Sequence, residues 1–380
     1  MTDDFGPALR RHRVASGVSQ PQLAKRAHVD QSAVSRWETG RTAPDRDTIE
    51  HLDQLLEAGG QLARLATAVA GAPTLRAPET DPAPPEAPVN ADDVEELRTG
   101  IANLVALDGR HGGAELVPIA ERMFRAASAR RAPGNCPAEL EADFVATVAE
   151  LGEVAGWLAF DAQHHGRARS LNLEALHLAR LAGDTSMELF LLGNMALLAQ
   201  ETGQPREALR TVQLMERFPL TPRLRVLVAM RRARAAADLG DERSLSLIQR
   251  AQVEVLGSVR STDPDWAWWV DHRELQVHEG GMWRAVGRPA RAVDCYAAAL
   301  DAVPRGYRWA SYIGGANLVS ALVEVRSWDE AERAASDVAN LAVEVSSARA
   351  ARRLRDAAVT ARRHRAPSSL ESTLTALAGR

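Results

Sequence analysis

Six prolines within residues 71–90 constrain the folding of this chain more than any other feature of its sequence. They are Pro73, Pro78, Pro82, Pro84, Pro85 and Pro88. Proline lacks a backbone N–H, and this segment holds few large apolar side chains, so no packed element is expected there. Residues 71–90 are therefore predicted to be a semi-rigid, Pro-rich linker between two separately folded parts.

Both folded parts are predicted to be all-α. Apolar residues recur at helical spacing through most of the chain, and no strand-like alternation bounded by turn pairs occurs. One example is the series Leu171, Leu173, Leu176, Leu178 and Leu181. We expect a bundle of about five helices in residues 1–70 and a much larger helical body in residues 91–380.

Composition and charge exclude several classes of protein. The chain is 46% hydrophobic and 25% charged, which excludes disorder as a whole. No run of 18 apolar residues occurs, and the N-terminus is acidic where a signal peptide would be basic, so we expect a cytoplasmic chain with no membrane contact. Cys136 and Cys295 lack metal-ligand spacing, so buried thiols are expected rather than a disulfide framework or a zinc site.

Two short helices are predicted near the N-terminus from their capping residues. Ser19 and Gln22 have the S-x-x-Q spacing of a capping box, and Pro21 is tolerated in the first turn of a helix. After a break near His28, Asp30 can cap a second helix that runs through Glu38 to a stop at Gly40. Two helices so closely joined form a helix-turn-helix.

The residues of these two helices resemble the Cro/C1-type (XRE) family of helix-turn-helix regulators. The similar segments read SQPQLA at residues 19–24 and VDQSAVSRWETG at residues 29–40, and the resemblance covers about residues 5–65. Two positions depart from the family. His28 stands where the turn usually has glycine, and Asp30 stands where the family usually has Ser or Thr.

The resemblance implies that the second helix enters the DNA major groove. The residues implied to meet base edges are Gln31, Ser32, Ser35 and Arg36, although for Arg36 a phosphate contact has equal weight. Gln20 and Arg41 are implied phosphate contacts. Arg13 and Glu38 match a structural salt bridge of the family, while Val34 and Trp37 are expected to pack under Leu9, Leu23 and Leu52.

Charge is unevenly distributed over the first part. Between residues 10 and 46 there are eight basic residues and three acidic ones, whereas Asp47, Glu50, Asp53 and Glu57 follow with no base among them. One side of the domain is thus predicted to attract phosphate and the other to repel it. The net charge of -4 for the whole chain conceals this local field.

The larger part shows a recurrent junction, a small or polar residue followed five positions later by Ala or Leu. It occurs at Gln163/Ala168, Gly203/Ala208, Gly240/Leu245, Gly287/Ala292 and Arg326/Ala331. Each junction is predicted to join a longer helix to a shorter one, which gives a solenoid of helical hairpins. The junctions resemble tetratricopeptide repeats, with armadillo-like or HEAT-like packing as alternatives. The combination of parts is similar to regulators of filamentous actinobacteria.

All three tyrosines and five of the eight tryptophans lie between residues 266 and 312. A pocket for a peptide or small-molecule effector is predicted there, with repeat packing as the alternative for each ring. The proposed pocket residues are Trp266, Trp269, Trp283, Tyr307 and Trp309. His272 and His278 are six positions apart, which suits no chelate, and are expected on a solvated helix face.

The leading functional hypothesis is a sequence-specific DNA-binding transcriptional regulator, a repressor. We expect a nucleoid-associated homodimer that binds an inverted-repeat operator in double-stranded DNA, with a repeat domain that dimerises and senses an effector. The alternative is a scaffold that binds a partner protein and uses its helix-turn-helix only as a DNA anchor. No motif of a catalytic, metal or cofactor site is found, so no enzyme activity and no cofactor are expected.

Overall fold

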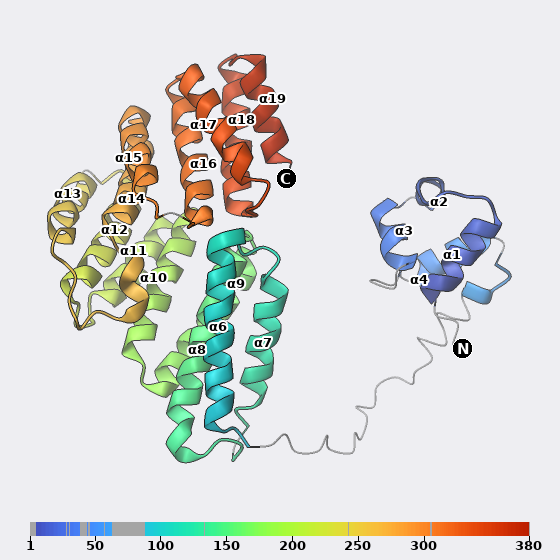
Figure 1. Ribbon diagram of the computed structural model, residues 1–380, viewed down its shortest axis with the longest axis horizontal. Coiled ribbons are helices and arrows are strands. Elements are labelled where there is room, and N and C mark those ends of the chain that lie inside the picture. The colour runs from blue at the N-terminus through green and yellow to red at the C-terminus, as the bar shows by residue number, and fades with distance from the viewer. Residues whose placement is uncertain are drawn as a thin grey trace. The chain divides into compact units, whose positions relative to one another are not determined.

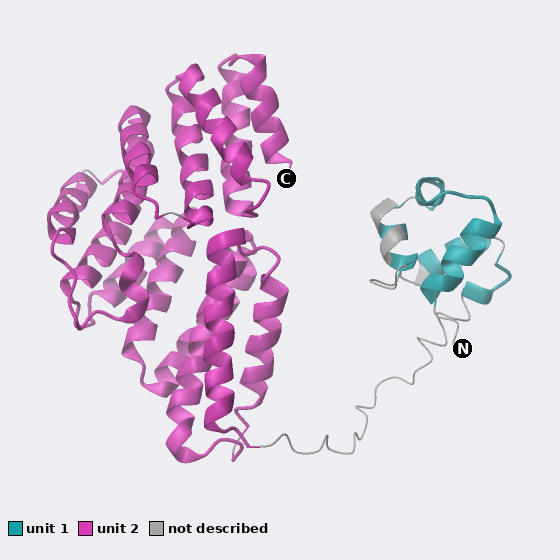
Figure 2. Ribbon diagram, in the orientation of Figure 1, with its two compact units in different colours: residues 1–86 teal, residues 87–380 magenta. Residues whose placement is uncertain are grey.

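The computed structural model describes residues 5–27, 29, 31–38, 44, 46–56, 58–62, 88–132, 134–241, 243–304 and 306–379. The chain forms two compact units, residues 1–86 and 87–380 (Figure 2). Every regular element in the described ranges is a helix, which confirms the prediction of an all-α fold (Figure 1). Most of the predicted linker, residues 71–87, lies outside the described residues.

The first unit contains four helices within its described residues. They are α1 (Phe5–Ala15), α2 (Gln20–Arg26), α3 (Gln31–Glu38) and α4 (Arg46–Leu55). The capping box predicted at the start of α2 is present, because Ser19 and Gln22 each accept from the other's backbone N–H. The predicted roles of His28, Asp30 and Gly40 lie outside the described residues.

The second unit is a series of helical hairpins. Its α-helices are α6 (Ala91–His111), α7 (Val117–Ala129), α8 (Ala138–Asp161), α9 (His165–Ala182), α10 (Thr185–Glu201), α11 (Pro205–Met215), α12 (Pro222–Asp238), α13 (Arg243–Val255), α14 (His272–Ala285), α15 (Pro289–Asp301), α16 (Arg308–Glu324), α17 (Trp328–Leu341), α18 (Ala348–Arg363) and α19 (Ser368–Ala378). A short 3-10 helix, η1 (Asp265–Trp269), precedes α14. From α8 onward, each even-numbered helix packs against the helix that follows it.

The five predicted junctions all lie between helices, and their first residues share one backbone conformation. Gln163, Gly203, Gly240, Gly287 and Arg326 have φ between 59° and 74°. This left-handed turn reverses the chain after the longer helix, at a steric cost for the two residues that are not glycine. Four of the alanines or leucines five positions later, all except Leu245, are at most 1% exposed. The predicted hairpin repeat is confirmed.

The helices of the second unit bury two main apolar clusters. One runs from α6 to α14 and the other occupies α16 to α19, and Trp157 of α8 packs against both. The last hairpins also contact the first ones, because α16 packs on α6 and Ser346 N donates to His111 O at 2.8 Å (Figure 1). The C-terminal end of α6 therefore meets the last hairpins of the series (Figure 1).

The prediction of two buried thiols is correct for one of the two cysteines. Both cysteines are free, but only Cys295 is buried, whereas Cys136 is half-buried, because it lies in the loop before α8. Among the described helices, none is both long enough and apolar enough to cross a bilayer.

Candidate functional site

The α2–α3 pair of the first unit rests on a small apolar core. Leu23 and Val34 are fully buried, and Trp37 is 8% exposed, together with Leu9 of α1 and Leu52 of α4. The expected core roles of Val34 and Trp37 are confirmed. Helix α1 approaches the end of α3 so closely that a Cβ atom on Gly6 would lie 2.6 Å from the carbonyl oxygen of Trp37. Only glycine allows this contact, which fixes the direction of α3.

A polar junction joins three helices of this unit at Glu38. Arg13 Nε lies 2.5 Å from Glu38 Oε1, and Arg13 Nη2 donates to Glu38 Oε2 at 3.0 Å. Gln20 Nε2 donates to the same Oε2 at 2.8 Å. Arg13 Nη1 also donates to Val18 O, just before α2 begins. The junction therefore holds α1, the start of α2 and the end of α3 in one arrangement.

The electrostatics of this junction favour its charged form. Burial acts to raise the pKa of the Glu38 carboxyl, but hydrogen bonds from Arg13 and Gln20 and the charge of Arg13 outweigh it, so the net pKa is lowered. The hydrogen bond with Glu38 likewise raises the pKa of Arg13. The Glu38 side chain is 7% exposed, and Arg13 and Gln20 supply the hydrogen bonds that water would otherwise make to its carboxylate. These bonds stabilise the position of α3.

Four of the predicted DNA-contacting residues belong to α3. Gln31, Ser32, Ser35 and Arg36 lie in α3, but their side chains are outside the described set, and Arg41 is outside it entirely. Gln20, an implied phosphate contact, is half-buried with its amide on Glu38. That bond uses one N–H of the side-chain amide and leaves the second N–H available to another acceptor.

The predicted division of charge needs one correction. Arg10, Arg11, Lys25 and Arg26 are exposed on α1 and α2, as a surface that attracts phosphate requires. Asp53, however, is not part of a repelling acidic surface. It is 7% exposed, and its carboxylate accepts from the backbone N–H groups of Gly60 at 2.7 Å and Leu62 at 2.8 Å, so it caps the chain segment that follows α4.

The aromatic residues of the predicted effector pocket belong to separate groups in the second unit. Trp266 of η1 stacks on Phe190 of α10 with ring centroids 4.4 Å apart, and Trp269 lies 6.2 Å from the same ring. The indole N–H of Trp266 donates to Ser186 at 2.9 Å. These contacts hold η1 against α10.

Tyr307 and Trp309 belong to a second group that starts from the same 3-10 helix. Trp268, which is 55% exposed, lies 6.1 Å from Tyr307, which lies 6.1 Å from Trp309. Trp309 in turn makes an edge contact with Trp157 at 5.7 Å. Trp283 lies apart from both groups, with its N–H on Glu279 and Arg291 beside its ring.

His278 is buried, contrary to the expectation of a solvated position. Its Nε2 lies 2.7 Å from Arg231 Nη1 and 3.3 Å from Glu274 Oε1, and the side chain is 7% exposed. The reason is helical spacing, because Glu274 is four positions earlier on the face of α14 that packs against α12. Burial, followed by the charge of Arg231, lowers the pKa of His278. His272 is exposed, as expected.

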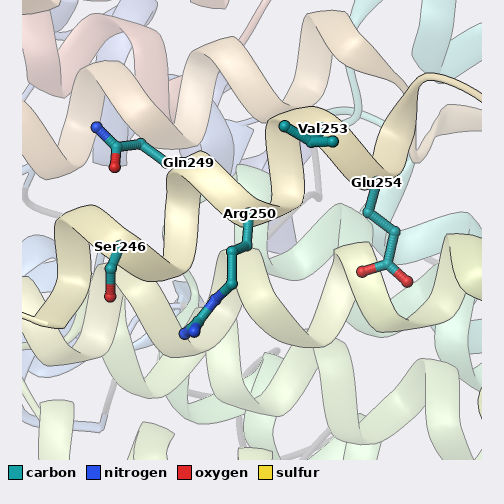
Figure 3. A pocket seen from close by; sticks show the side chains of 5 residues that line it. All are labelled: Ser246, Gln249, Arg250, Val253 and Glu254. Carbon is teal, nitrogen blue, oxygen red and sulfur yellow. The ribbon is translucent and has the colours of Figure 1, made fainter.

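The described part of the second unit has two hollows that none of the five predicted pocket residues lines. A groove of about 480 Å³ is lined by residues of α13 alone, namely Ser246, Gln249, Arg250, Val253 and Glu254 (Figure 3). A cavity of about 10 Å³ lies beside Trp157, Phe160 and Asn172, which is room for a single water molecule.

Comparison with known proteins identifies the first unit. The family described as a helix-turn-helix domain matches residues 4–66. A search of curated proteins found no match. Among solved structures, one similar chain is Bacillus thuringiensis PlcR, in a crystal structure with the peptide PapR7 and DNA; it is 15% identical, the alignment covers 78% of this chain and 92% of that chain, and the TM-score is 0.38. Residues 4–66 are a helix-turn-helix domain, the kind of module by which transcriptional regulators bind DNA.

Proposed function

We propose that this chain is a sequence-specific DNA-binding transcriptional regulator of the XRE type, with α3 as its recognition helix. The observation that carries the proposal is the packing of α3, whose Val34 and Trp37 face the core while Glu38 is held by Arg13 and Gln20. Helical periodicity supports this role for positions 32, 35 and 36, which fall away from the Val34 and Trp37 face, while Gln31 begins α3 at the border of that face. Exposed Arg10, Lys25 and Arg26 supply the positive charge that phosphates attract.

We further propose that the regulator is an actinobacterial repressor that acts as a homodimer on the nucleoid. A single module of this size offers little surface, so tight binding at physiological salt favours two modules on an inverted repeat, with half-sites about one helical turn apart. The second unit, a body of helical hairpins several times larger than the first, is suited to pairing two chains and to sensing an effector.

Selection of binding sites from random DNA with the full chain tests the DNA-binding proposal. We expect an enriched inverted repeat, and Gln31→Ala should weaken the selected site by about 1 to 3 kcal/mol and relax the preference at one base position. Gln20→Ala should weaken all sequences equally, because a phosphate contact carries no base information. Equal weakening of all sequences by Gln31→Ala would contradict its assignment to a base.

The oligomeric state is tested separately by light scattering with and without the selected DNA. The expected result is the mass of two chains per inverted repeat. A single chain bound per site, or a partner protein that binds the second unit while operator affinity stays constant, would favour the scaffold function instead.

A further inference from the structure

The outer face of α18, at the C-terminal end of the second unit, carries a strip of positive charge (Figure 1). Arg355, Arg362 and Arg363 are exposed. The second and third of them follow the first by two turns of helix, so all three lie on one side of α18. Leu354 and Ala361, on the opposite side, are completely buried. The arginine side chains are therefore directed to solvent.

Few acidic residues balance this charge. Residues 348–365 contain seven arginines, and Asp356 is their one acidic residue. Arg349 and Arg353 form ion pairs with α8 and α10, so their charges are already neutralised. We define the basic face of α18 as Arg355, Arg362, Arg363 and Arg365. All four are exposed, and none of them forms an ion pair with a described residue.

The acidic residues of the last hairpins belong mainly to another helix. Helix α17 carries four acidic residues and one basic residue, and it packs against α16 and α19. Two of its carboxylates accept hydrogen bonds from serines, Glu330 from Ser327 and Glu332 from Ser369. Positive and negative charge are thus separated by helix, which leaves the basic face of α18 without a neutralising partner in the described part of the chain.

Two turns bring arginines to the C-terminal end of α18 at a steric cost. Arg326 and Arg365 have φ of 59° and 56°, a left-handed conformation that glycine adopts without strain. The two turns are close together, because Arg326 Nη2 lies 3.0 Å from His364 Nδ1. Three equivalent hairpin junctions have glycine, at Gly203, Gly240 and Gly287. Arginine at these two strained positions adds positive charge where glycine would relieve the strain.

We propose that the basic face of α18 is a second DNA-contacting surface, which binds the phosphate backbone of the duplex beside the operator. A duplex carries one negative charge per about 1.7 Å, so about seven charges lie along the roughly 12 Å of helix from Arg355 to Arg363. Guanidinium groups bind phosphate oxygens through paired hydrogen bonds. Such a contact needs no groove and carries no base information. Its place beside an operator rests on the proposed function, whereas its affinity for duplex DNA does not.

The covalent length of the chain allows both units to contact one duplex. Residues 63–87 separate Leu62 from Pro88, and a stretch of this length spans at most about 80 to 90 Å. At about 3.4 Å per base pair, this limit corresponds to about 25 base pairs. The second unit can therefore reach DNA that flanks the site of the helix-turn-helix.

Binding of the full chain to a random-sequence duplex of about 60 base pairs tests the surface without requiring an operator. The variant has Arg355→Gln, Arg362→Gln and Arg363→Gln together. At about 50 mM salt, we expect its affinity to be at least about tenfold below that of the wild-type chain. The slope of log K against log salt concentration should become shallower by about 2 to 3, because each phosphate contact contributes about 0.9.

A matched variant separates this face from net charge. Arg206→Gln, Arg210→Gln and Arg217→Gln remove the same charge from exposed positions in and just after α11, where Glu207 lies among them. This variant should bind the random duplex like the wild-type chain. Equal losses in the two triple variants would mean that any lost charge weakens binding, which would overturn the proposal.

Lysine at the three α18 positions provides a second check. The triple lysine variant should keep most of the affinity, because a phosphate contact requires the charge above all. If the glutamine variant does not fold, Arg362→Gln alone should make the salt slope shallower by about 1. Unchanged affinity and slope in the folded glutamine variants would overturn the proposal, and an acidic protein surface would then be the better partner for this face.

Operator duplexes of two lengths separate this inference from the proposed function. On a duplex that holds the inverted repeat alone, the α18 glutamine variant should bind like the wild-type chain, and with about 25 added base pairs on each side it should bind more weakly. Equal losses on both duplexes would overturn the flanking position. If the wild-type chain binds all sequences equally, the proposed function fails, while the random duplex still decides whether α18 contacts DNA.

Discussion

The Nε atom of Arg349 lies 3.3 Å from Oδ1 of Asp161. Arg349 is in the first turn of α18 and Asp161 is the last residue of α8, so this ion pair joins the last hairpins of the second unit to the first ones. The contact is reinforced by Arg353, which pairs with Glu201 at 3.0 Å, and by Ser347, which bonds to Asp161. Among the described residues, Trp157 is the one side chain that packs against both main apolar clusters, so charged and aromatic contacts join the first and last hairpins of the second unit.

Replacing Arg349 by Met should destabilise the second unit strongly. The substitution leaves the fully buried Asp161 without its cation, and removing one partner of a buried ion pair costs about 3 to 5 kcal/mol. Urea unfolding followed by tryptophan fluorescence measures the loss. Arg355→Met, at an exposed position of the same helix, should change the free energy of unfolding little. Equal effects of the two substitutions would contradict a structural role for the pair.

The local features of this fold could be predicted from the sequence. The capping box at Ser19, the buried positions of Val34 and Trp37, and the five hairpin junctions depend on residues close together in the chain. Helical periodicity and capping act over a few residues, so a sequence pattern displays them directly.

Contacts between distant segments could not be predicted in the same way. Nothing in the apolar pattern of α8 or α18 says that Asp161 meets Arg349; the one available signal was a single aspartate directly after the apolar run that ends at Phe160. The burial of Asp53 and of His278 could not be predicted for a related reason. Asp53 accepts from a backbone N–H group of the loop after α4, and His278 contacts Arg231 of another helix, so neither position follows from a count of charges along the sequence. The clustering of aromatic residues in sequence likewise did not show that they divide into separate groups.

Arg13→Gln should weaken both the first unit and its binding to DNA. The substitution removes two charge-assisted hydrogen bonds to Glu38, and we expect the free energy of unfolding of this unit to fall by about 2 kcal/mol. Arg10→Gln is the matched control, since it removes the same charge from an exposed position of the same helix. Amide hydrogen exchange in α1–α3 of the full chain measures stability.

The same two variants separate structure from simple electrostatics in DNA binding. Both lose one positive charge, but that of Arg10 is exposed whereas that of Arg13 is paired with Glu38, so a purely electrostatic effect would reduce operator affinity more for Arg10→Gln. We expect a larger reduction for Arg13→Gln, because α3 loses the contact that fixes its direction. Identical affinities at matched salt would mean that the junction does not orient the recognition helix.

Two glycine-to-alanine substitutions in the second unit should have opposite signs. Gly203 has a φ of 72° and no neighbouring atom within 4 Å of an added Cβ, so Gly203→Ala should destabilise the unit by about 1 to 2 kcal/mol through backbone strain alone. Gly166, in the first turn of α9, also has open space but no positive φ, and Gly166→Ala should be neutral or stabilising. Thermal unfolding of both variants measures the difference. Equal destabilisation of both would show that the left-handed conformation of Gly203 is not the cause.

Asp108 should make the second unit less stable as pH rises. Burial, followed by repulsion from Asp161, raises the pKa of this carboxyl from 3.8 to about 7. Between these two values the folded chain holds more protons than the unfolded chain, so the free energy of unfolding decreases as pH increases through this window. The stabilisation is fully present below about pH 4 and is lost as pH rises through about 7.

Asp108→Asn removes this titration and keeps an oxygen that can accept from Trp157. We therefore expect the variant to exceed the wild-type chain in stability by at least about 1 kcal/mol near pH 8, and the difference to vanish near pH 4. Tryptophan fluorescence during urea unfolding reports on this unit, because seven of the eight tryptophans lie in it. A constant difference between Asp108→Asn and wild type at both pH values would contradict the raised pKa.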